Sequence, residues 1–343
     1  MGDTSASAGV VSLGELDPQE HEHGIRSFRL YRLSHAAGGV DIGASLYELD
    51  AGTRSFPAHY HVANEEALYV LEGRLTLWTG SGDDPIRREV TAGEYVAFPT
   101  GPAFAHDLEA VEDARFLFLS TMVEPDFTVF PEDRKVTLVA GDAPGEFDDL
   151  YVSKTLDFDA ELPFWDDEES GGDGHAAERV PEELRRVAAD DLDWTEYDHG
   201  DHRFRRKQLG AAAGSEDLGA SRYEVPPGKR TWLAHYHTGN EEAVYVLDGS
   251  GTVTLGIDRE EHTIGAGDYV ALPAGERGYH DIVAGEAGLS LLMVSTMNEP
   301  DITVYPDDGK VGLYAGSAPG GEKDERTLST YLDADAEVEY WEW

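Results

Sequence analysis

An internal repeat constrains this 343-residue sequence more than any other feature. The segment His59–Ala67 returns with two changes as His235–Ala243, and Tyr69–Gly73 returns as Tyr245–Gly249. In both pairs the second copy begins 176 residues after the first (235 − 59 and 245 − 69). This period is far longer than the roughly 20–50 residues of solenoid repeats. The sequence therefore predicts two copies of one domain.

The copies divide the chain into two domains joined by a short linker. Gly, Ser and acidic residues gather at Glu168–Gly174, between the copies, and this composition is typical of a flexible linker. The expected boundaries are residues 1–168 for the N-terminal domain, 169–189 for the linker and 190–343 for the C-terminal domain. Pro181–Arg186 fits one short helix. The first 20 residues are expected to stay loose or to lie across the other domain.

Within each copy the sequence predicts strands. Short apolar and β-branched runs alternate with Gly, Pro and Asp turns, as in Ala67–Leu71, Leu75–Trp78, Tyr95–Phe98 and Arg115–Leu119. Evenly spaced strands with few helical stretches indicate a sandwich or a barrel. The expected fold class is therefore all-β, with two similar domains in tandem.

The charge of the chain limits its partners. It carries 26 Lys and Arg residues against 69 Asp and Glu residues, which gives a formal net charge of −43. A polyphosphate would be repelled, because affinity for nucleic acid comes largely from Lys and Arg. An anionic membrane surface would be repelled for the same reason. We therefore expect neither nucleic acid nor a membrane as a partner.

The acidic excess also indicates a habitat. The apolar content of the chain is that of a folded protein. The acidic residues therefore fit a surface adapted to molar salt, where charge repulsion is screened. The alternative is an acidic protein from a non-halophile. The sequence has no apolar run of about 18 residues, and Met1–Leu13 lacks the basic and apolar parts of a secretory signal. The expected location is the cytoplasm, in particular the high-salt cytoplasm of a halophile.

The histidines supply the candidate chemistry, because the chain contains no Cys and therefore no thiolate ligand or nucleophile. His59 and His61 stand two residues apart on a strand-like segment, so both project from one face. Glu66 opens the next apolar run, and His106 follows it in a later segment. The second copy repeats this set as His235, His237, Glu242 and His280.

Two solvated imidazoles on a surface strand are the ordinary explanation of an isolated His-x-His pair. Here the same Glu and the same distant His accompany the pair in both copies, although other residues have diverged. The prediction is therefore one divalent transition metal in each domain. Imidazole and carboxylate ligands suit Mn, Fe, Ni, Co, Cu or Zn without selecting one. Four protein ligands around an octahedral ion leave two open positions, which favours an enzyme's site over a closed structural one.

The residues around these ligands resemble the two motifs of the cupin superfamily. The first motif is matched by Gly52, His59, His61, Glu66 and Gly73, and again by Gly228, His235, His237, Glu242 and Gly249. The second is matched by Gly93, Pro99, Gly101 and His106, and again by Gly267, Pro273, Gly275 and His280. Ala110 and Ala284 stand where that motif ends in Asn, which affects a structural position and no ligand.

The chain is thus similar to a two-domain bicupin of a broad prokaryotic group, for which a haloarchaeal source is expected. The resemblance implies two tandem cupin barrels (jelly-roll, double-stranded β-helix) related by the internal repeat. It also implies a metal inside the mouth of each barrel. The superfamily includes enzymes and non-enzymatic binders, so the resemblance alone does not give the function.

The two copies differ beside the expected metal. The first copy continues its second motif with the apolar Pro102–Ala105, whereas the second offers Glu276, Arg277 and Tyr279 next to the ligand His280. These three are the candidate catalytic residues, with Glu276 or Tyr279 as the proton donor.

Arg222 is the candidate substrate-binding residue. It aligns with Leu46 on the strand before the first motif, and a guanidinium that points inward would pair with a carboxylate. The alternative is that Arg222 and Arg277 pair with surface acids. Glu65 and Glu241 precede the ligand glutamates, so strand alternation turns them away from the metal, and we expect both to be solvated.

The expected function is that of a metal-dependent oxidoreductase or lyase, of the dioxygenase or decarboxylase type. Its substrate would be a small oxygen-rich molecule such as a carboxylate or a hydroxylated aromatic. One alternative is a non-catalytic, metal-assisted protein that binds or senses a sugar or a carboxylate. A second is a sugar-phosphate isomerase. A structural storage role is disfavoured because both ligand sets are complete, and association into a homo-oligomer is optional.

Overall fold

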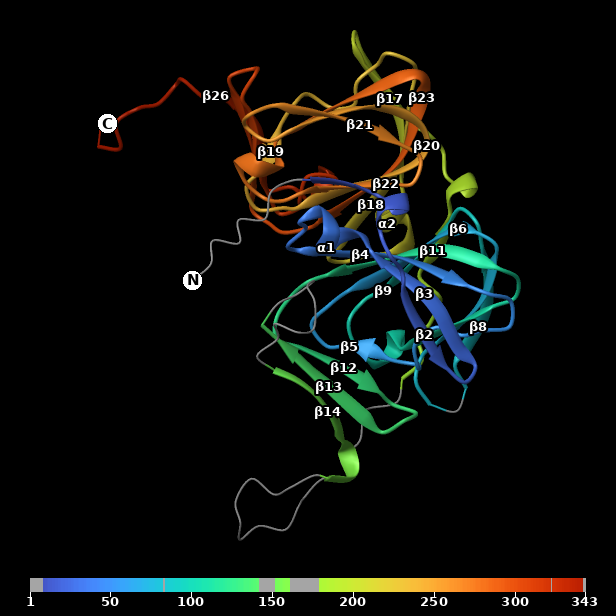
Figure 1. Cartoon of the computed structure of the whole chain (residues 1–343). Helices are drawn as coiled ribbons and strands as arrows, with labels where there is room; N and C mark the ends of the chain where they lie inside the picture. The colour runs from blue at the N-terminus through green and yellow to red at the C-terminus, as the bar shows by residue number, and fades with distance from the viewer. Residues whose placement is uncertain (1–8, 83, 142–151, 161–178, 322, 342–343) are drawn as a thin grey trace.

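The computed structural model describes residues 9–82, 84–141, 152–160, 179–321 and 323–341. They form two stacked β-rich units that follow the two copies of the repeat (Figure 1). The first copy contains β1 (Gly9–Ser12), β2 (Gln19–His23), β3 (Arg26–Arg32), α1 (Leu33–Ala37), β4 (Ile42–Leu49), β5 (Tyr60–His61), β6 (Glu66–Glu72), β7 (Arg74–Thr79), β8 (Ile86–Thr91), β9 (Glu94–Phe98), β10 (His106–Ala110), β11 (Ala114–Thr121), β12 (Asp126–Phe130), β13 (Lys135–Ala140) and β14 (Val152–Asp157). The second contains β15 (Arg186–Ala188), β16 (Thr195–His199), β17 (His202–Gln208), α2 (Leu209–Ala213), β18 (Leu218–Val225), β19 (Tyr236–His237), β20 (Glu242–Leu255), β21 (Glu260–Gly265), β22 (Asp268–Leu272), β23 (His280–Thr296), β24 (Asp301–Tyr305), β25 (Lys310–Ala315) and β26 (Leu328–Asp333).

The largest sheet has the same strand order in both units. It runs β15-β9-β6-β11-β4-β3-β2 in the N-terminal unit and β1-β22-β20-β23-β18-β17-β16 in the C-terminal unit. Smaller sheets complete the units: β10-β7-β8 and β14-β13-β12-β5 in the first, and β19-β24-β25-β26 in the second. The all-β jelly-roll prediction is confirmed. The strand orders among the described residues are open, however, so the sheets do not close into barrels.

The first strand of each copy belongs to the sheet of the other copy. β1 pairs with β22, where Val10 lies opposite Val270, and β15 pairs with β9, where Arg186 lies opposite Val96. Residues 9–12 therefore lie across the other unit, which confirms one of the two expectations for the start of the chain. The exchange of strands ties the two units together.

The segment between the units runs along the N-terminal unit. The amide of Ala97 donates to the carbonyl oxygen of Arg185 at 2.8 Å. The helix expected over Pro181–Arg186 is wrong, because these residues form a bend and irregular backbone that leads into β15. The Gly-rich part of the expected linker, residues 169–178, lies outside the described residues. The domain boundaries themselves stay a prediction.

The central strands bury both of their faces, which explains their nearly continuous apolar runs. In β6, Leu68 and Val70 belong to the core of the N-terminal unit. Ala67 and Tyr69, on the opposite face, belong to an apolar layer to which both units contribute. Such a strand shows no alternation of apolar and polar residues, because neither face meets water.

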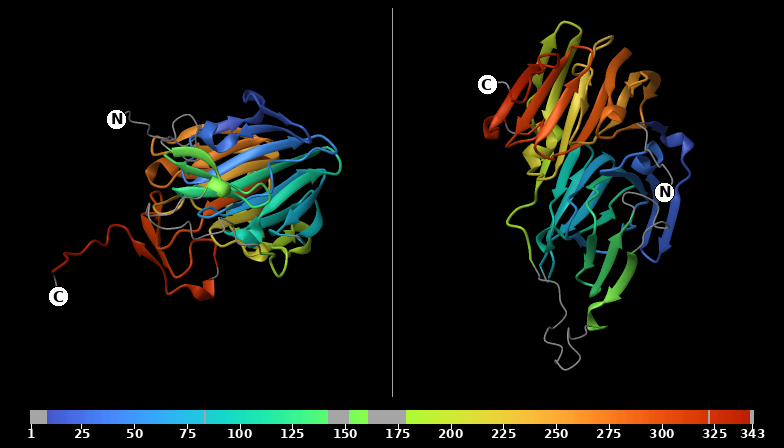
Figure 2. Two further views of the ribbon diagram at one scale, coloured as in Figure 1. Left: turned by 90° about the horizontal axis from the view of Figure 1, so that it is seen from below. Right: turned by 90° about the vertical axis from the view of Figure 1, so that its left-hand side faces the viewer.

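Two short helices cross the boundary between the units. α1 contacts β1 and β22, and α2 contacts β9 and β15. Each helix ends at a glycine in the left-handed region, Gly38 with φ 80° and Gly214 with φ 82°, which is the usual way to stop a helix. The right-hand view in Figure 2 shows the units packed directly against each other. None of the helices in the described residues has the length and apolar character needed to span a membrane.

Candidate metal centres

Short strands and bridges bring the predicted ligands of each copy together. β5 pairs with β12 and carries His61. His59 forms an antiparallel bridge with His106, in which each backbone amide donates to the other carbonyl oxygen, at 3.2 and 2.9 Å. Glu66 begins β6 beside them. The same bridge joins His235 to His280 in the second copy.

The imidazoles converge on the carboxylate through their Nε2 atoms. In the N-terminal centre, Oε2 of Glu66 lies 3.8 Å from Nε2 of His59, 3.5 Å from that of His61 and 3.3 Å from that of His106. In the C-terminal centre the equivalent distances from Glu242 are 3.7, 3.6 and 3.5 Å, for His235, His237 and His280. Two ligand atoms that each lie about 2.1 Å from one ion are about 3 Å apart in octahedral geometry. Both centres are therefore close to the dimensions of a four-ligand metal site.

Hydrogen bonds at Nδ1 fix the orientation of the rings. Nδ1 of His59 lies 2.7 Å from the carbonyl oxygen of Pro57, and Nδ1 of His106 lies 3.1 Å from that of Phe104. A carbonyl oxygen only accepts, so Nδ1 carries the proton and Nε2 keeps its lone pair. His235 and His280 are held in the same way by the carbonyl oxygens of Leu233 and Gly278, at 2.6 and 2.9 Å.

The remaining histidine of each centre is held by an aspartate that the sequence analysis did not select. Nδ1 of His237 lies 2.6 Å from Oδ2 of Asp301, and His61 makes the equivalent hydrogen bond to Asp126. Both aspartates are buried. A carboxylate behind a histidine orients the ring and makes its other nitrogen a stronger ligand. A signal was present, because both aspartates follow a Glu-Pro pair that recurs in the repeat.

The buried polar atoms of the centres fit a bound cation. Oε2 of Glu66, Nε2 of His106 and Oε2 of Glu242 are buried and have no hydrogen-bond partner among the described residues. Lone pairs of carboxylate and imidazole face one another there, which is unfavourable without a positive charge between them. The ligand atoms of His59, Glu66 and His106 lie within 4.8 Å of one another, as do those of the equivalent three in the second copy.

Burial keeps part of each ligand set neutral. Burial, helped by the neighbouring His106, lowers the pKa of His59 to about 3. The pKa of His235 is lowered well below its usual value for the same reason. Burial also acts on His237, but the carboxylates of Glu242 and Asp301 outweigh it and raise its pKa. His59 and His235 are therefore unprotonated at neutral pH, the form that binds metals.

The C-terminal centre opens onto a large cavity of about 1180 Å³. His235, His237 and Glu242 form part of its wall. Most of the other lining residues come from β16–β18 and from the segment between β24 and β26. A ligand in this cavity thus has direct access to the metal ligands.

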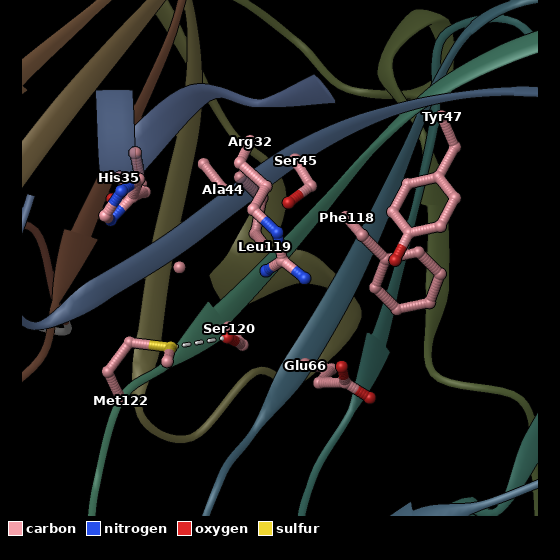
Figure 3. Close-up of a pocket in the computed structure, with 12 residues that line it drawn as sticks. Arg32, His35, Ala44, Ser45, Tyr47, Glu66, Phe118, Leu119, Ser120 and Met122 are labelled. Carbon is pink, nitrogen blue, oxygen red and sulfur yellow. Dashed lines mark hydrogen bonds between the residues drawn. The ribbon is translucent and has the colours of Figure 1, made fainter. Parts of the chain in front are cut away.

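A cavity of about 110 Å³ reaches Glu66 in the N-terminal unit. Figure 3 shows the guanidinium of Arg32 and the ring of Tyr47 directed into the space that Glu66 also lines. Nε of Arg32 donates to Oε1 of Gln19 at 3.1 Å. The cavity is therefore polar, with a cation and a phenol near the ligand carboxylate.

Arg222 does not line the C-terminal cavity, so its contacts support the alternative that it pairs with acids and give no support to substrate binding. Ser221 and Tyr223 line the cavity, so strand alternation turns Arg222 to the other face of β18. There it donates to Glu224 at 3.4 Å and lies 5.9 Å from the ring of Trp194. Its counterpart Leu46 belongs to the apolar layer shared by the units. The face of the strand that carries Leu46 or Arg222 is therefore the face toward the other unit, not the face toward the metal centre.

The three candidate catalytic residues also lie away from the cavity. Glu276 and Arg277 are exposed on a 3₁₀ turn, and neither lines the cavity. Tyr279 is buried, but its hydroxyl donates to Asp307 at 2.9 Å and accepts from Arg259 at 2.7 Å. The turn serves the centre through its backbone, because the carbonyl oxygen of Gly278 holds the ring of His280.

Four cationic residues line the C-terminal cavity, namely Arg206, Lys310, Lys323 and Arg326. Arg206 lies on β17, beside Tyr223. Its Nε and Nη2 donate to Oγ of Ser221 at 3.0 and 2.9 Å, and its guanidinium lies 5.6 Å from the ring of Tyr223. The sequence carries a signal for this arginine that the motifs do not include. The first copy has the buried Leu30 at this position, so an arginine there replaces a core residue.

Glu65 and Glu241 are buried, which corrects the expectation that they are solvated. They do point away from the metal, but the other unit covers them, and their exposed fractions are 1% and 0%. Oε2 of Glu65 accepts from backbone amides of the C-terminal unit, and Oε2 of Glu241 accepts from those of the N-terminal unit.

Comparison with known proteins agrees with this architecture. The family model described as the cupin domain matches residues 45–122 and 221–295. Oxalate decarboxylase of Bacillus subtilis at pH 4.6 has a similar structure, with a TM-score of 0.53 and 16% identity over 85% of this chain and 78% of that chain. An alanine mutant of the same enzyme gives a TM-score of 0.55 and 16% identity over 89% and 82%. A third structure of it, whose title names its Mn(II) centres, gives 0.52 and 15% over 85% and 78%. At these identities the likeness concerns the fold, and no curated protein matches the sequence.

Proposed function

Because the chain belongs to the cupin superfamily as a two-domain member, we propose that it is a metal-dependent lyase or oxidoreductase acting on a carboxylate at its C-terminal centre. The observation that carries the proposal is the opening of three ligands of this centre onto a large cavity that also contains Arg206. A metal site inside an accessible cavity suits catalysis more than structural support.

His235, His237, Glu242 and His280 would hold the ion, and the equivalent four residues would do so in the N-terminal unit. When bound, the ion supplies Lewis acidity toward an oxygen of the substrate. The donor atoms are three imidazole nitrogens and one carboxylate oxygen, a set that fits manganese among other transition metals. Manganese is also the metal named for the decarboxylase of similar fold, so it is the first metal to test.

Arg206 would bind the carboxylate of the substrate. In a chain with 69 acidic residues, no carboxylate among the described residues pairs with it. Its partners are a hydroxyl and an aromatic ring, so its remaining N–H groups are available to a ligand. A guanidinium inside a cavity recognises a carboxylate by paired hydrogen bonds.

Tyr223 would donate a proton or a hydrogen bond to the substrate. Its hydroxyl oxygen accepts from Nε1 of Trp232 at 3.1 Å, which leaves its own proton for another acceptor. Burial raises the pKa of Tyr223, so the proton is retained at neutral pH. Tyr223 shares the cavity lining with Arg206 and the metal ligand Glu242, which supports this role. Tyr223 thus replaces Tyr279 as the candidate donor.

The test is turnover by the metal-loaded protein on a panel of carboxylates, with oxygen uptake and carbon dioxide release both recorded. The double variant His235→Ala/His237→Ala disables the C-terminal centre, and His59→Ala/His61→Ala is the matched control in the other unit. We expect turnover to be lost in the first and retained in the second. Tight binding of carboxylates without turnover would instead assign a non-catalytic binding protein. Turnover that survives His235→Ala/His237→Ala would show that the reaction does not take place at the C-terminal centre.

A further inference from the structure

The size and lining of the C-terminal cavity select among carboxylates, an inference that rests on the function proposed above. Its volume of about 1180 Å³ lies above the usual range of about 300–1,000 Å³ for small-molecule sites. A two-carbon acid such as oxalate would leave most of this space unfilled. The cavity therefore fits a larger ligand than the substrate named for the decarboxylase of similar fold.

One wall of the cavity is aromatic. Tyr197 and Phe204 are stacked with their centroids 4.7 Å apart, and Trp232 packs edge-on against both, at 4.7 and 4.6 Å. Tyr223 joins this group at 5.6 Å from Phe204. We refer to Tyr197, Phe204, Tyr223 and Trp232 as the aromatic wall. Flat, rigid faces of this kind bind other rings by stacked or edge-on contact.

A second group of rings approaches the metal ligands. Tyr305 stacks on the ligand His235 with centroids 5.6 Å apart, and Tyr331 lies 6.1 Å from Tyr305. The hydroxyl of Tyr314 donates to that of Tyr331 at 2.9 Å. All three line the cavity. Rings thus border both the metal centre and the space beyond it.

We propose that the C-terminal cavity takes an aromatic carboxylate, with its acid group at Arg206 and its ring along the aromatic wall. The arginine meets a requirement that rings alone do not, because it offers a positive charge and paired N–H donors to the acid group beside the aromatic wall. The contact of Arg206 with Tyr223 places the charge at the edge of the wall, where an acid group attached to a ring would end.

The experiment is calorimetric titration of the manganese-loaded protein with benzoate, 2-naphthoate, cyclohexanecarboxylate, acetate and oxalate. Benzoate and 2-naphthoate should bind at least tenfold more tightly than cyclohexanecarboxylate, their non-aromatic counterpart. Arg206→Leu, which introduces the residue of the first copy, should weaken both aromatic acids at least tenfold at unchanged metal content. Arg205→Leu is the matched control, since Arg205 lies on the opposite face of β17 and pairs with Glu224.

Trp232→Leu provides an independent check. It removes one ring of the aromatic wall and should abolish the preference for benzoate over cyclohexanecarboxylate. Equal affinity for the aromatic and the non-aromatic acids in the unchanged protein would overturn the aromatic assignment while leaving a carboxylate function intact. Failure of every acid to bind a protein that does hold metal would overturn the proposed function together with this inference.

A different observation carries a second inference, which concerns the link between the two centres. Oε2 of Glu65 accepts from the amides of Glu216 at 2.9 Å, Leu218 at 3.2 Å and Asp217 between them. These amides precede or begin β18, whose residues line the C-terminal cavity. The neighbour of Glu65 in the chain is the metal ligand Glu66.

The link is reciprocal. Oε2 of Glu241 accepts from the amides of Val40 and Asp41, at 2.8 and 2.7 Å, just before β4. β4 lines the N-terminal cavity, and the neighbour of Glu241 is the ligand Glu242. The carboxylate beside each centre thus fixes the beginning of the strand that lines the other cavity.

The backbone around these carboxylates is itself restrained. The amide of Glu65 donates to Oγ1 of Thr121 at 3.0 Å, and the amide of Thr121 donates back to the carbonyl oxygen of Glu65 at 3.0 Å. Glu65 and Glu66 are neighbours in this restrained backbone, so a shift of Glu66 on metal binding would be passed to Glu65. We infer that Glu65 and Glu241 are positioning residues that transmit metal occupancy of one centre to the cavity wall of the other.

Hydrogen exchange tests this inference directly. In His235→Ala/His237→Ala, metal loads only the N-terminal centre, and loading should slow exchange at the amides of residues 216–218 at least threefold. Adding Glu65→Gln should remove most of this effect while the N-terminal metal content stays unchanged. Exchange at residues 216–218 that does not respond to metal would overturn the inference. So would a full response in the Glu65→Gln background.

Discussion

Replacing Glu65 by alanine is expected to destabilise the chain, because its buried carboxylate accepts from three amides of the other unit, of which the amide of Leu218 belongs to a buried residue. Each buried donor left without a partner costs about 1–3 kcal/mol. Burial also raises the pKa of Glu65, which means that its charge is costly to keep there and that its removal returns part of the loss. Water can replace the carboxylate at the exposed Glu216 and Asp217, so the expected decrease in the free energy of unfolding is about 2–3 kcal/mol.

Two further variants sharpen this prediction. Glu65→Gln keeps one oxygen acceptor and should cost only about 1–2 kcal/mol. Glu72→Ala removes a glutamate of the same unit whose side chain is 65% exposed and pairs with Arg115, so it should cost less than about 1 kcal/mol.

Urea unfolding of the metal-free proteins measures these differences, with circular dichroism and tryptophan fluorescence followed together. Removing the metal keeps changes at Glu66 from contributing to the comparison. A Glu65→Ala protein that unfolds within 1 kcal/mol of the unchanged chain, with the same dependence on urea, would refute the claim that this carboxylate holds the two units together.

Three other outcomes follow from the centres. Asp301→Ala should weaken metal binding at the C-terminal centre about 10–100-fold in a metal titration and leave the N-terminal centre unchanged, because the ring of His237 loses its carboxylate partner and keeps only the hydroxyl of Thr303. The metal-free protein should lose stability in unfolding experiments as the pH falls from about 6.5 toward 3, because His59 binds a proton in the unfolded chain before it does so in the folded one; His59→Gln should flatten this dependence. Metal at 100 times its dissociation constant should raise the free energy of unfolding by about 2.7 kcal/mol per centre, an increase that a chelator reverses in a thermal melt.

The internal repeat made much of the fold and the ligand sets predictable. The paired motifs located His59 and His235 in equivalent places, and the structure brings each of them to the predicted glutamate. Asp126 and Asp301 were also repeated, but their role depends on a strand pairing, β12 with β5, that the sequence does not reveal. Each aspartate can be recognised as a hydrogen-bond partner only once its neighbouring histidine ring is known from the structure.

What the sequence could not predict depends on the contact between the two units. Strand alternation correctly predicted that Glu65 points away from the metal. The prediction that it is solvated was wrong, because the second unit covers that face of the strand. The same contact explains Arg222. An alignment with the buried Leu46 suggested an inward side chain, although Leu46 is buried in the layer between the units. Ser221 and Tyr223 of this strand line the cavity, and the neighbouring strand contributes Arg206.

Metal content tests the central claim most directly. Elemental analysis of the protein purified without chelator from manganese-replete medium should give two metal ions per chain. The variant His235→Ala/His237→Ala should retain one, as should His59→Ala/His61→Ala, and the quadruple variant should retain none. Absence of stoichiometric metal from the unchanged protein, or two ions in the quadruple variant, would contradict the account.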